Sequence, residues 1–187
     1  MRRLLHAPGL WLALTLSAPA ACNEPEQDPL DPDAVEAVAK DEGDATGTTR
    51  SGAYQLQLVG TPSCDCPMTS EIALCSVDLS TLTVAGVAVT MTQSDGYLQL
   101  SGVSADSRVD LGGALDASGE FELAGIYDLG NVLGEGNLYI RLSGRFTGQD
   151  EFTATLIDRA LGSYNNQTID CRTEGDVLGM RVLGEAT

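Results

Sequence analysis

Five cysteines carry the most distinctive chemistry in this chain. Four of them, Cys64, Cys66, Cys75 and Cys171, lie beyond residue 50, whereas Cys22 stands apart near the N-terminus. In an oxidising compartment four cysteines usually form two disulfide bonds. A bond between Cys64 and Cys66 would close a strained small ring. We therefore predict that Cys64 and Cys66 each pair with Cys75 or Cys171, so that one disulfide spans about 100 residues.

The same cysteines allow two metal sites and a redox site as alternatives. Cys64, Cys66 and Met68 at every second position form a soft ligand set suited to Cu(I). Four thiolates could bind zinc, although the spacing lacks the two C-x-x-C pairs typical of such sites. A redox C-x-C would need a nearby positive charge to lower a thiol pKa, and no lysine or evident helix N-terminus supplies one. We predict structural disulfides, with no metal and no cofactor.

Three residue types that serve much of catalysis are missing from the chain beyond residue 50. The only histidine is His6, the only tryptophan is Trp11 and the only lysine is Lys40. This excludes from that region Ser-His-Asp and Cys-His catalysis, histidine metal ligation, Schiff-base chemistry and the P-loop lysine. We predict no catalytic residues and a non-enzymatic protein.

Carboxylates are abundant enough that some must lie close together. A glycoside hydrolase needs two acids roughly 5–10 Å apart, so a carboxylate-based hydrolase is one alternative function. Candidate acids flank Cys171 (Asp170, Glu174, Asp176) or follow one another at Asp106 and Asp110. They are equally well explained as solvated charges or as an opportunistic Ca²⁺ site, because the chain has no EF-hand loop pattern.

The N-terminus has the three parts of a secretory signal peptide. Arg2 and Arg3 supply positive charge, residues 10–16 are apolar, and small residues follow up to Ala21. The apolar run is too short to span a bilayer, which needs roughly 20 residues. We assign residues 1–21 as a signal peptide, which places the protein outside the cytoplasm.

Two cleavage sites are possible in this signal peptide. Ala18-Pro19-Ala20 fits ordinary signal peptidase, which would leave a periplasmic or secreted protein. Pro19-Ala20-Ala21-Cys22 resembles the lipobox of bacterial lipoproteins, although that family usually has an aliphatic residue in place of Pro19. The resemblance implies that Cys22 is acylated and anchors the chain to a membrane. Acylation would also leave an even number of cysteines for disulfides. Asn23 after the cysteine implies the outer membrane or the cell surface.

Residues 22–50 have the composition of a disordered acidic tether. Nine acidic side chains face only Lys40 and Arg50, with three prolines and no aromatic residue. Such a segment cannot bury enough apolar surface to offset the entropy of ordering, and it repels itself. A short helix around residues 34–40 is the alternative to a solvated spacer.

Residues 51–187 show the period-two alternation of half-buried strands. Apolar residues alternate with polar ones at 54–58, 98–101, 120–123, 138–146, 152–156 and 178–182. Turn sequences separate these runs at 94–96, 116–119, 134–136 and 148–150. We predict one all-β domain, an antiparallel meander of about 8–10 strands. A closed or nearly closed barrel is favoured over a two-sheet sandwich, because Gly144 lies on the inward face of a long strand.

A formal net charge of −17 makes nucleic acid an improbable partner, since the chain repels phosphates. The best interpretation of the sequence is a lipid-anchored binding module of the envelope or cell surface. Its ligand would be a protein partner or a small apolar molecule held inside the barrel. The alternatives are a structural or interaction protein of the outer membrane and the carboxylate-based hydrolase.

Overall fold

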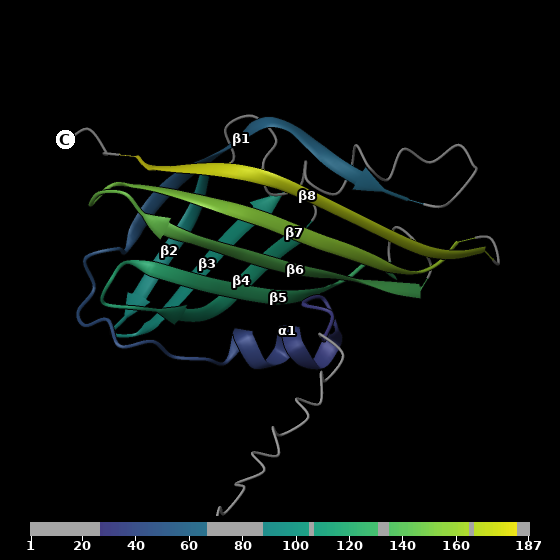
Figure 1. Ribbon diagram of the computed structural model, residues 1–187, viewed down its shortest axis with the longest axis horizontal. Helices are drawn as coiled ribbons and strands as arrows, with labels where there is room; N and C mark the ends of the chain where they lie inside the picture. Colours follow the sequence, from purple (N-terminus) through teal and green to yellow (C-terminus); the bar gives the residue numbers. More distant parts are fainter. Residues whose placement is uncertain (1–26, 67–87, 105–106, 131–134, 165–166, 183–187) are drawn as a thin grey trace, which may run out of the picture.

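The structure, a computed structural model, describes residues 27–66, 88–104, 107–130, 135–164 and 167–182. Eight strands follow one another in an antiparallel meander, and β8 pairs with β1 to close a barrel (Figure 1). The strands are β1 (Gly52–Asp65), β2 (Ala88–Ser94), β3 (Tyr97–Ser104), β4 (Ser107–Leu115), β5 (Glu120–Asp128), β6 (Glu135–Phe146), β7 (Glu151–Tyr164) and β8 (Gln167–Arg181). The predicted all-β meander is confirmed, as a barrel rather than a sandwich. None of the described segments forms a helix long and apolar enough to cross a membrane.

Strict alternation sends one face of each strand into the barrel. In β6, Leu138, Ile140 and Leu142 are buried, whereas Ser143 and Arg145 are exposed. Gly144 continues the inward face, and a Cβ there would collide with the backbone of the neighbouring strand β7. The glycine expected at this position therefore lies where the barrel wall leaves no room for a side chain.

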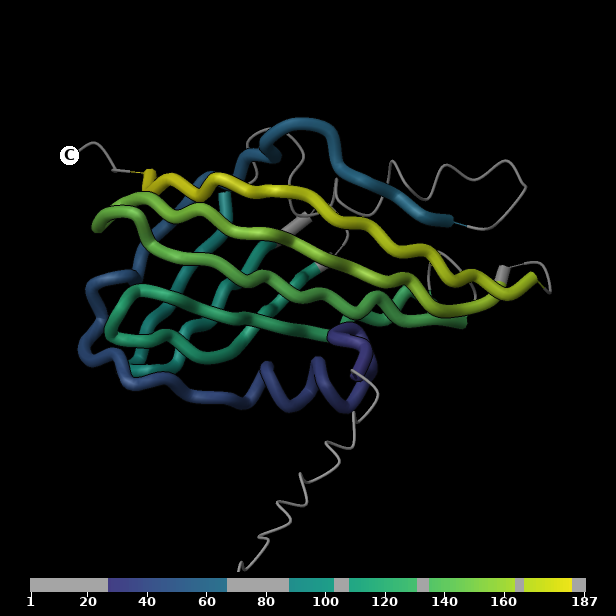
Figure 2. The backbone as a smooth tube through the Cα atoms, viewed as in Figure 1, coloured from purple at the N-terminus to yellow at the C-terminus, as the bar shows by residue number. Residues whose placement is uncertain are grey.

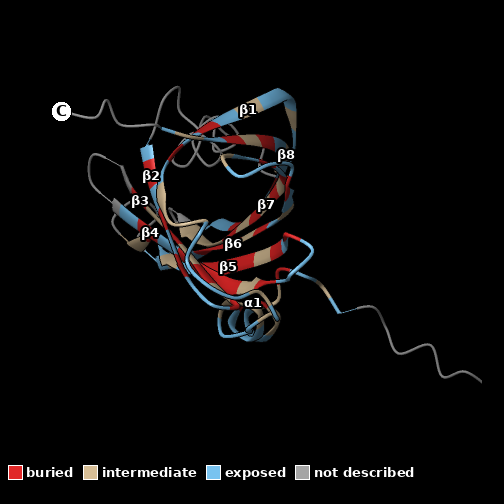
Figure 3. Cartoon of the chain, turned by 90° about the vertical axis from the view of Figure 1, so that its left-hand side faces the viewer, coloured by how far each residue is buried: buried red, intermediate tan, exposed pale blue. Residues whose placement is uncertain are grey.

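The barrel interior is filled by side chains. At one end Phe152 lies at the centre of an aromatic cluster, with ring centres 5.8 Å from Tyr54, 5.2 Å from Phe121 and 5.5 Å from Phe146. Aliphatic side chains from all eight strands complete one continuous core. Figure 3, a view toward one end of the barrel, shows buried residues distributed along its strands. This is the packing expected of an eight-stranded barrel, whose interior is just wide enough for its own side chains.

Most predicted turns connect the strands as expected. Asp95 adopts a left-handed conformation (φ 50°) between β2 and β3, and residues 116–119 join β4 to β5. The turn predicted at 134–136 is wrong in part, because Glu135 and Gly136 already belong to β6 and pair with β7.

The predicted disordered tether is wrong for residues 27–50. Helix α1 (Pro32–Ala39) packs on the outer face of β4–β6, and Leu30 and Val35 are fully buried there. Composition indicated disorder because the acidic side chains dominate it, but the few apolar residues occur at helical spacing and share one face. Residues 22–26 and the signal peptide lie outside the described residues. The folded unit therefore includes residues 27–50 as well as the eight strands.

Beyond α1 the chain runs along the barrel and around one of its ends before entering β1 (Figure 2). The Gly43 N–H donates to the Gly96 carbonyl (3.0 Å), and the Ala45 N–H donates to the Leu115 carbonyl (3.1 Å). Arg50 places its guanidinium carbon 4.3 Å from the ring centre of Phe146. Residues 43–50, called here the strap, thus cover the end of the barrel that contains the aromatic cluster.

Candidate functional site

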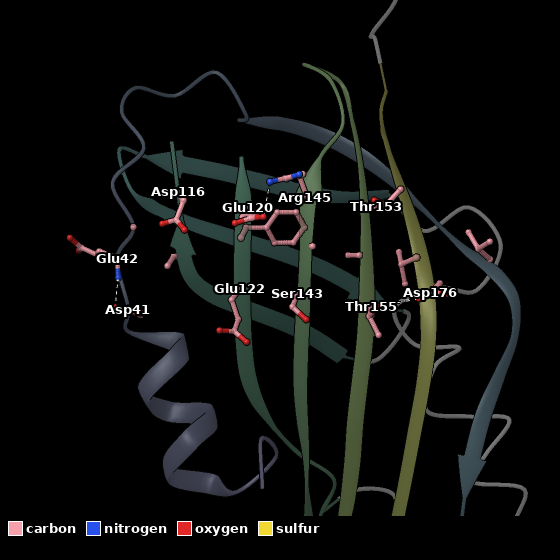
Figure 4. Close-up of a pocket in the computed structure, with 17 residues that line it drawn as sticks. Asp41, Glu42, Asp116, Glu120, Glu122, Ser143, Arg145, Thr153, Thr155 and Asp176 are labelled. Atoms are coloured by element: carbon pink, nitrogen blue, oxygen red, sulfur yellow. Dashed lines mark hydrogen bonds and ion pairs between the residues drawn. The ribbon is translucent and has the colours of Figure 1, made fainter. Parts of the chain in front are cut away.

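A groove of about 970 Å³ lies on the outside of the barrel. Its floor is the outer face of β5, β6, β7 and β8 (Figure 4). Residues 41–43, which lead from α1 into the strap, line one side, and Val59 of β1 lines the other. The groove is open to solvent and separate from the packed interior.

A straight row of polar side chains crosses the groove floor. Glu122 pairs with Ser143, Ser143 with Thr155, and Thr155 with Asp176 in the strand register. Figure 4 shows these four residues in line over four strands. Neighbouring strands lie about 4.8 Å apart, so the backbone positions of Glu122 and Asp176 are separated by roughly 14 Å. The arrangement is a flat, extended surface rather than a pocket that closes on one atom.

The groove carries a strong negative charge. It is lined by six carboxylates (Asp41, Glu42, Asp116, Glu120, Glu122, Asp176) and by one guanidinium, that of Arg145. Arg145 is occupied by an ion pair with Glu120 at 2.7 Å. Glu122 pairs with Arg141 from the neighbouring strand, and Asp176 accepts a hydrogen bond from the Thr155 hydroxyl at 3.1 Å. The remaining four carboxylates, Asp41, Glu42, Asp116 and Asp176, make no ion pair with the described residues.

At three carboxyl groups the pKa is shifted in the direction opposite to the one that a general acid needs. The pKa is lowered at Asp28, Asp110 and Asp170. At Asp170 the main cause is the hydrogen bond from Arg159, which stabilises the ionised form. A glycoside hydrolase needs one acid whose pKa is raised so that it can protonate the leaving group. Glu122 and Asp176, at the two ends of the row, are also farther apart at the backbone than the 5–10 Å such enzymes use.

The structure assigns Cys64, Cys66 and Cys171 to disulfides. Cys66 is bonded to Cys171 over a sequence separation of 105 residues, which confirms the long-range bridge. Cys64 is disulfide-bonded as well. While these bonds are intact, Cys64, Cys66 and Cys171 have no thiolate to offer a metal ion. Cys22 and Cys75 lie outside the described residues.

The acids considered for hydrolysis or Ca²⁺ binding are scattered rather than gathered into one site. Asp170 pairs with Arg159 at 2.8 Å, and Asp110 pairs with Arg108 at 2.8 Å. Asp176 lines the groove, Glu174 does not, and Asp106 lies outside the described residues. In the part of the chain that the structure describes, no three acidic, histidine or cysteine residues are placed to hold a metal ion.

The groove cannot be read from the sequence, although the outward positions of several of its residues can. The alternation of β5 and β6 places Glu120, Glu122, Ser143 and Arg145 on the outward face. Their alignment into rows depends on the register between strands, which a single sequence does not reveal. The wall formed by residues 41–43 falls in the segment whose composition predicts a disordered tether.

In comparisons with known proteins, no family model and no curated protein matches this chain. Its function therefore has to be argued from the geometry and charge of the molecule.

Proposed function

We propose that this protein is an exported, lipid-anchored binding module of the envelope or cell surface, and that its outer groove recognises a positively charged partner. The observation that carries the proposal is the ratio of six carboxylates to one guanidinium along the groove. Glu122 and Asp176 of the row belong to a hydrogen-bonded sheet, so the backbone positions of these two charges are fixed before a partner arrives. A lysine- or arginine-rich segment of another envelope protein fits this surface.

Compartment and anchor are inferred from independent features. The Cys66–Cys171 disulfide is typical of proteins in oxidising compartments, which supports export. The sequence ahead of Cys22 supports removal of a signal peptide and acylation of that cysteine. The net charge of −17 disfavours nucleic acid and favours cationic partners.

The barrel interior is a poor place for the ligand. Buried side chains from every strand occupy it, including the polar pair Asp158 and Thr173. A small apolar ligand would have to displace this packing, at a cost of several kcal/mol. The alternative function, a structural or interaction protein of the outer membrane, is compatible with the same groove. A binding module and a structural protein would both use it to contact a protein partner. No observation specifically favours the hydrolase.

Binding to a short oligolysine peptide tests the groove. The variant E122Q/D176N removes two charges from the floor, and the matched control D33N/E174Q removes two charges from exposed positions outside it. We expect the groove variant to weaken binding roughly five- to thirty-fold, or about 1–2 kcal/mol, measured by titration calorimetry at low salt. The control should retain the affinity of the unmodified protein. Equal losses in both variants would show non-specific attraction to the acidic surface and would overturn the proposal for the groove.

The intact mass of the protein isolated from its membrane tests the anchor. We expect the mass of an acylated chain beginning at Cys22, with four hydrogens missing for two disulfides. A chain beginning at Ala21 without lipid would overturn the lipid anchor and leave a soluble exported protein.

A further inference from the structure

Three arginines of the barrel bind the N-terminal segment close to its first described residue. The Asp28 carboxylate pairs with Arg159 at 3.0 Å and also with Arg172. Arg159 is in turn fixed by two hydrogen bonds to Asp170, both at 2.8 Å. The guanidinium of Arg141 donates to the Pro29 carbonyl at 3.1 Å. Because the three arginines lie on β6, β7 and β8, the segment is fastened to the outer face of three adjacent strands.

Apolar packing strengthens this attachment directly after the ion pairs. Leu30 and Val35 are completely buried, in a cluster with Ala124 of β5 and Tyr139 of β6. Asp31 caps α1 by accepting from the Asp33 N–H at 3.0 Å, so the helix begins where the ion pairs end. The segment thus combines charge pairing, a helix cap and buried apolar contacts, which together make it part of the fold.

The far end of α1 and the strap are fixed as well. The Tyr97 hydroxyl donates to the Ala39 carbonyl at 3.1 Å, at the last residue of the helix. In the strap, the Gly47 N–H and carbonyl both bond to Asp95, and the Arg50 N–H donates to the Gln93 side chain at 2.9 Å. From Asp28 to β1 the chain therefore contacts the barrel repeatedly and leaves no long free stretch.

Because the chain is bound to the barrel from Asp28 onward, only residues 22–28 determine the maximum distance between an anchor at residue 22 and the barrel. Six peptide units join Cys22 to Asp28, and their fully extended length is about 20 Å. A free tether from residue 22 to residue 50 would instead extend to roughly 100 Å. The fastened segment shortens the reach of the protein about fivefold.

We propose that the docked N-terminal segment holds the barrel against a bilayer, with the α1 side next to the lipid surface and β1 directed away from it. The proposal rests on the lipid anchor of the proposed function. Figures 1 and 3 place α1 and β1 on opposite sides of the barrel. The first turns of α1 carry exposed acidic side chains at Asp33 and Glu36. The surface next to this side must therefore be zwitterionic phospholipid, since anionic headgroups would repel it.

Proteolysis by a lysine-specific protease measures the docking directly, because Lys40 is the only lysine in the chain. The Lys40 side chain is exposed, but cutting after it requires several residues of backbone to detach from the barrel. We expect slow cleavage in the unmodified full-length protein. The variant L30D, which places a charge in the fully buried position, should be cut about tenfold faster or more. V59D introduces the same side chain at a half-exposed position on β1 and should be cut at the unmodified rate.

The height of the protein above a supported bilayer of zwitterionic phospholipid, measured by neutron reflectometry, tests the consequence. The acylated protein should leave a gap of no more than about 20 Å between lipid headgroups and barrel. L30D should give a wider gap, approaching the roughly 30 Å average end-to-end distance of a flexible chain from residue 22 to residue 50. Should L30D fail to fold, D28N weakens the same attachment without burying a charge and should shift both readouts in the same direction.

The outcomes separate the docking from the anchor. If mass analysis finds no lipid on Cys22, a phospholipid coupled to the α-amino group of a chain beginning at residue 22 supplies the attachment, and the same gap is expected. In that case the anchor is wrong and the docking stands. Rapid cleavage after Lys40 in the unmodified protein, or an equal gap with and without L30D, would overturn the docking proposal even if Cys22 is acylated.

Discussion

The carboxylate of Asp28 lies 3.0 Å from a guanidinium nitrogen of Arg159, although 131 residues separate the two along the chain. Arg159 in turn makes a two-pronged contact with Asp170 on the adjacent strand β8. A fork-shaped guanidinium can serve two carboxylates at once, which a lysine could not do with the same geometry. The contact joins the start of the described chain to the last two strands of the barrel.

This ion-pair network predicts a loss of stability in acid. Burial alone would raise the pKa of Asp28, but hydrogen bonds from the Leu30 N–H and Arg172 outweigh it, so the pKa is lowered. The pKa of Asp170 is lowered chiefly by its hydrogen bond from Arg159. A carboxyl group with a lowered pKa stabilises the folded state above its unfolded pKa, and this contribution is lost as the pH falls through the folded value. We therefore expect the free energy of unfolding to decrease below about pH 4.

The variant D170N isolates one part of that acid sensitivity. At neutral pH it should lower the free energy of unfolding by roughly 0.5–1 kcal/mol, since the pair is partly exposed to solvent. Below about pH 4 the variant should lose stability less steeply than the unmodified protein. Urea denaturation over a pH series measures both effects. Parallel pH curves for the two proteins would contradict the assignment.

The Cys66–Cys171 disulfide should be a major source of stability. It joins the end of β1 to β8 over 105 residues, and restriction of the unfolded chain by such a loop is worth about 4 kcal/mol. We expect the variant C66A/C171A to lower the denaturation midpoint accordingly, with the disulfide of Cys64 still in place. Mass analysis under native conditions checks that second bond. A midpoint unchanged by the variant would mean that strand pairing alone closes the barrel.

Packing around Phe152 can be tested by a pair of substitutions. Gly179 of β8 is paired with Phe152, and a Cβ at Gly179 would collide with the phenylalanine ring. We expect F152A to cost about 3–5 kcal/mol and G179A about 1–3 kcal/mol. The double variant should cost clearly less than the sum, because the cavity left by the ring accepts the added methyl group. Strictly additive losses in urea denaturation would contradict the steric explanation for Gly179.

The barrel could be predicted from the sequence because most of its strands alternate without interruption. β4 was missed, since Gly112 and Gly113 break its apolar pattern after Leu111. The structure explains Gly112 through its neighbours: a Cβ there would collide with the Tyr97 hydroxyl and approach the Ala39 carbonyl of α1. That requirement arises from packing between elements far apart in sequence, which alternation within one strand cannot express.

The groove and the docked segment escaped prediction for a related reason. Alternation shows that Glu122 and Asp176 both point outward, but only the pairing of four strands places them in one row. In the N-terminal segment, the acidic residues dominate the composition, whereas its order depends on two buried residues, Leu30 and Val35, and on arginines of distant strands. The available signal was the presence of arginines at outward positions of the strands, such as Arg141 and Arg159, which bind the N-terminal segment.

The close approach of Gly43 and Gly96 gives the sharpest test of the strap. A Cβ at Gly96 would collide with the Gly43 backbone carbonyl, so the strap cannot keep its hydrogen bond to that turn in the variant G96A. We expect G96A to lose about 1–3 kcal/mol of stability and to be cut faster after Lys40 by a lysine-specific protease. Gly148 is the matched control, because a Cβ there would meet nothing within 4 Å.

The two readouts together locate the effect of G96A. If only the strap detaches, cleavage after Lys40 should become faster. The free energy of unfolding measured in urea should then fall by no more than about 1–3 kcal/mol. G148A, in the turn between β6 and β7, should leave both measurements unchanged. If G96A were cut no faster than G148A, the strap would tolerate a side chain at its tightest contact, and the backbone approach at Gly43 would not be what fastens it to the barrel end.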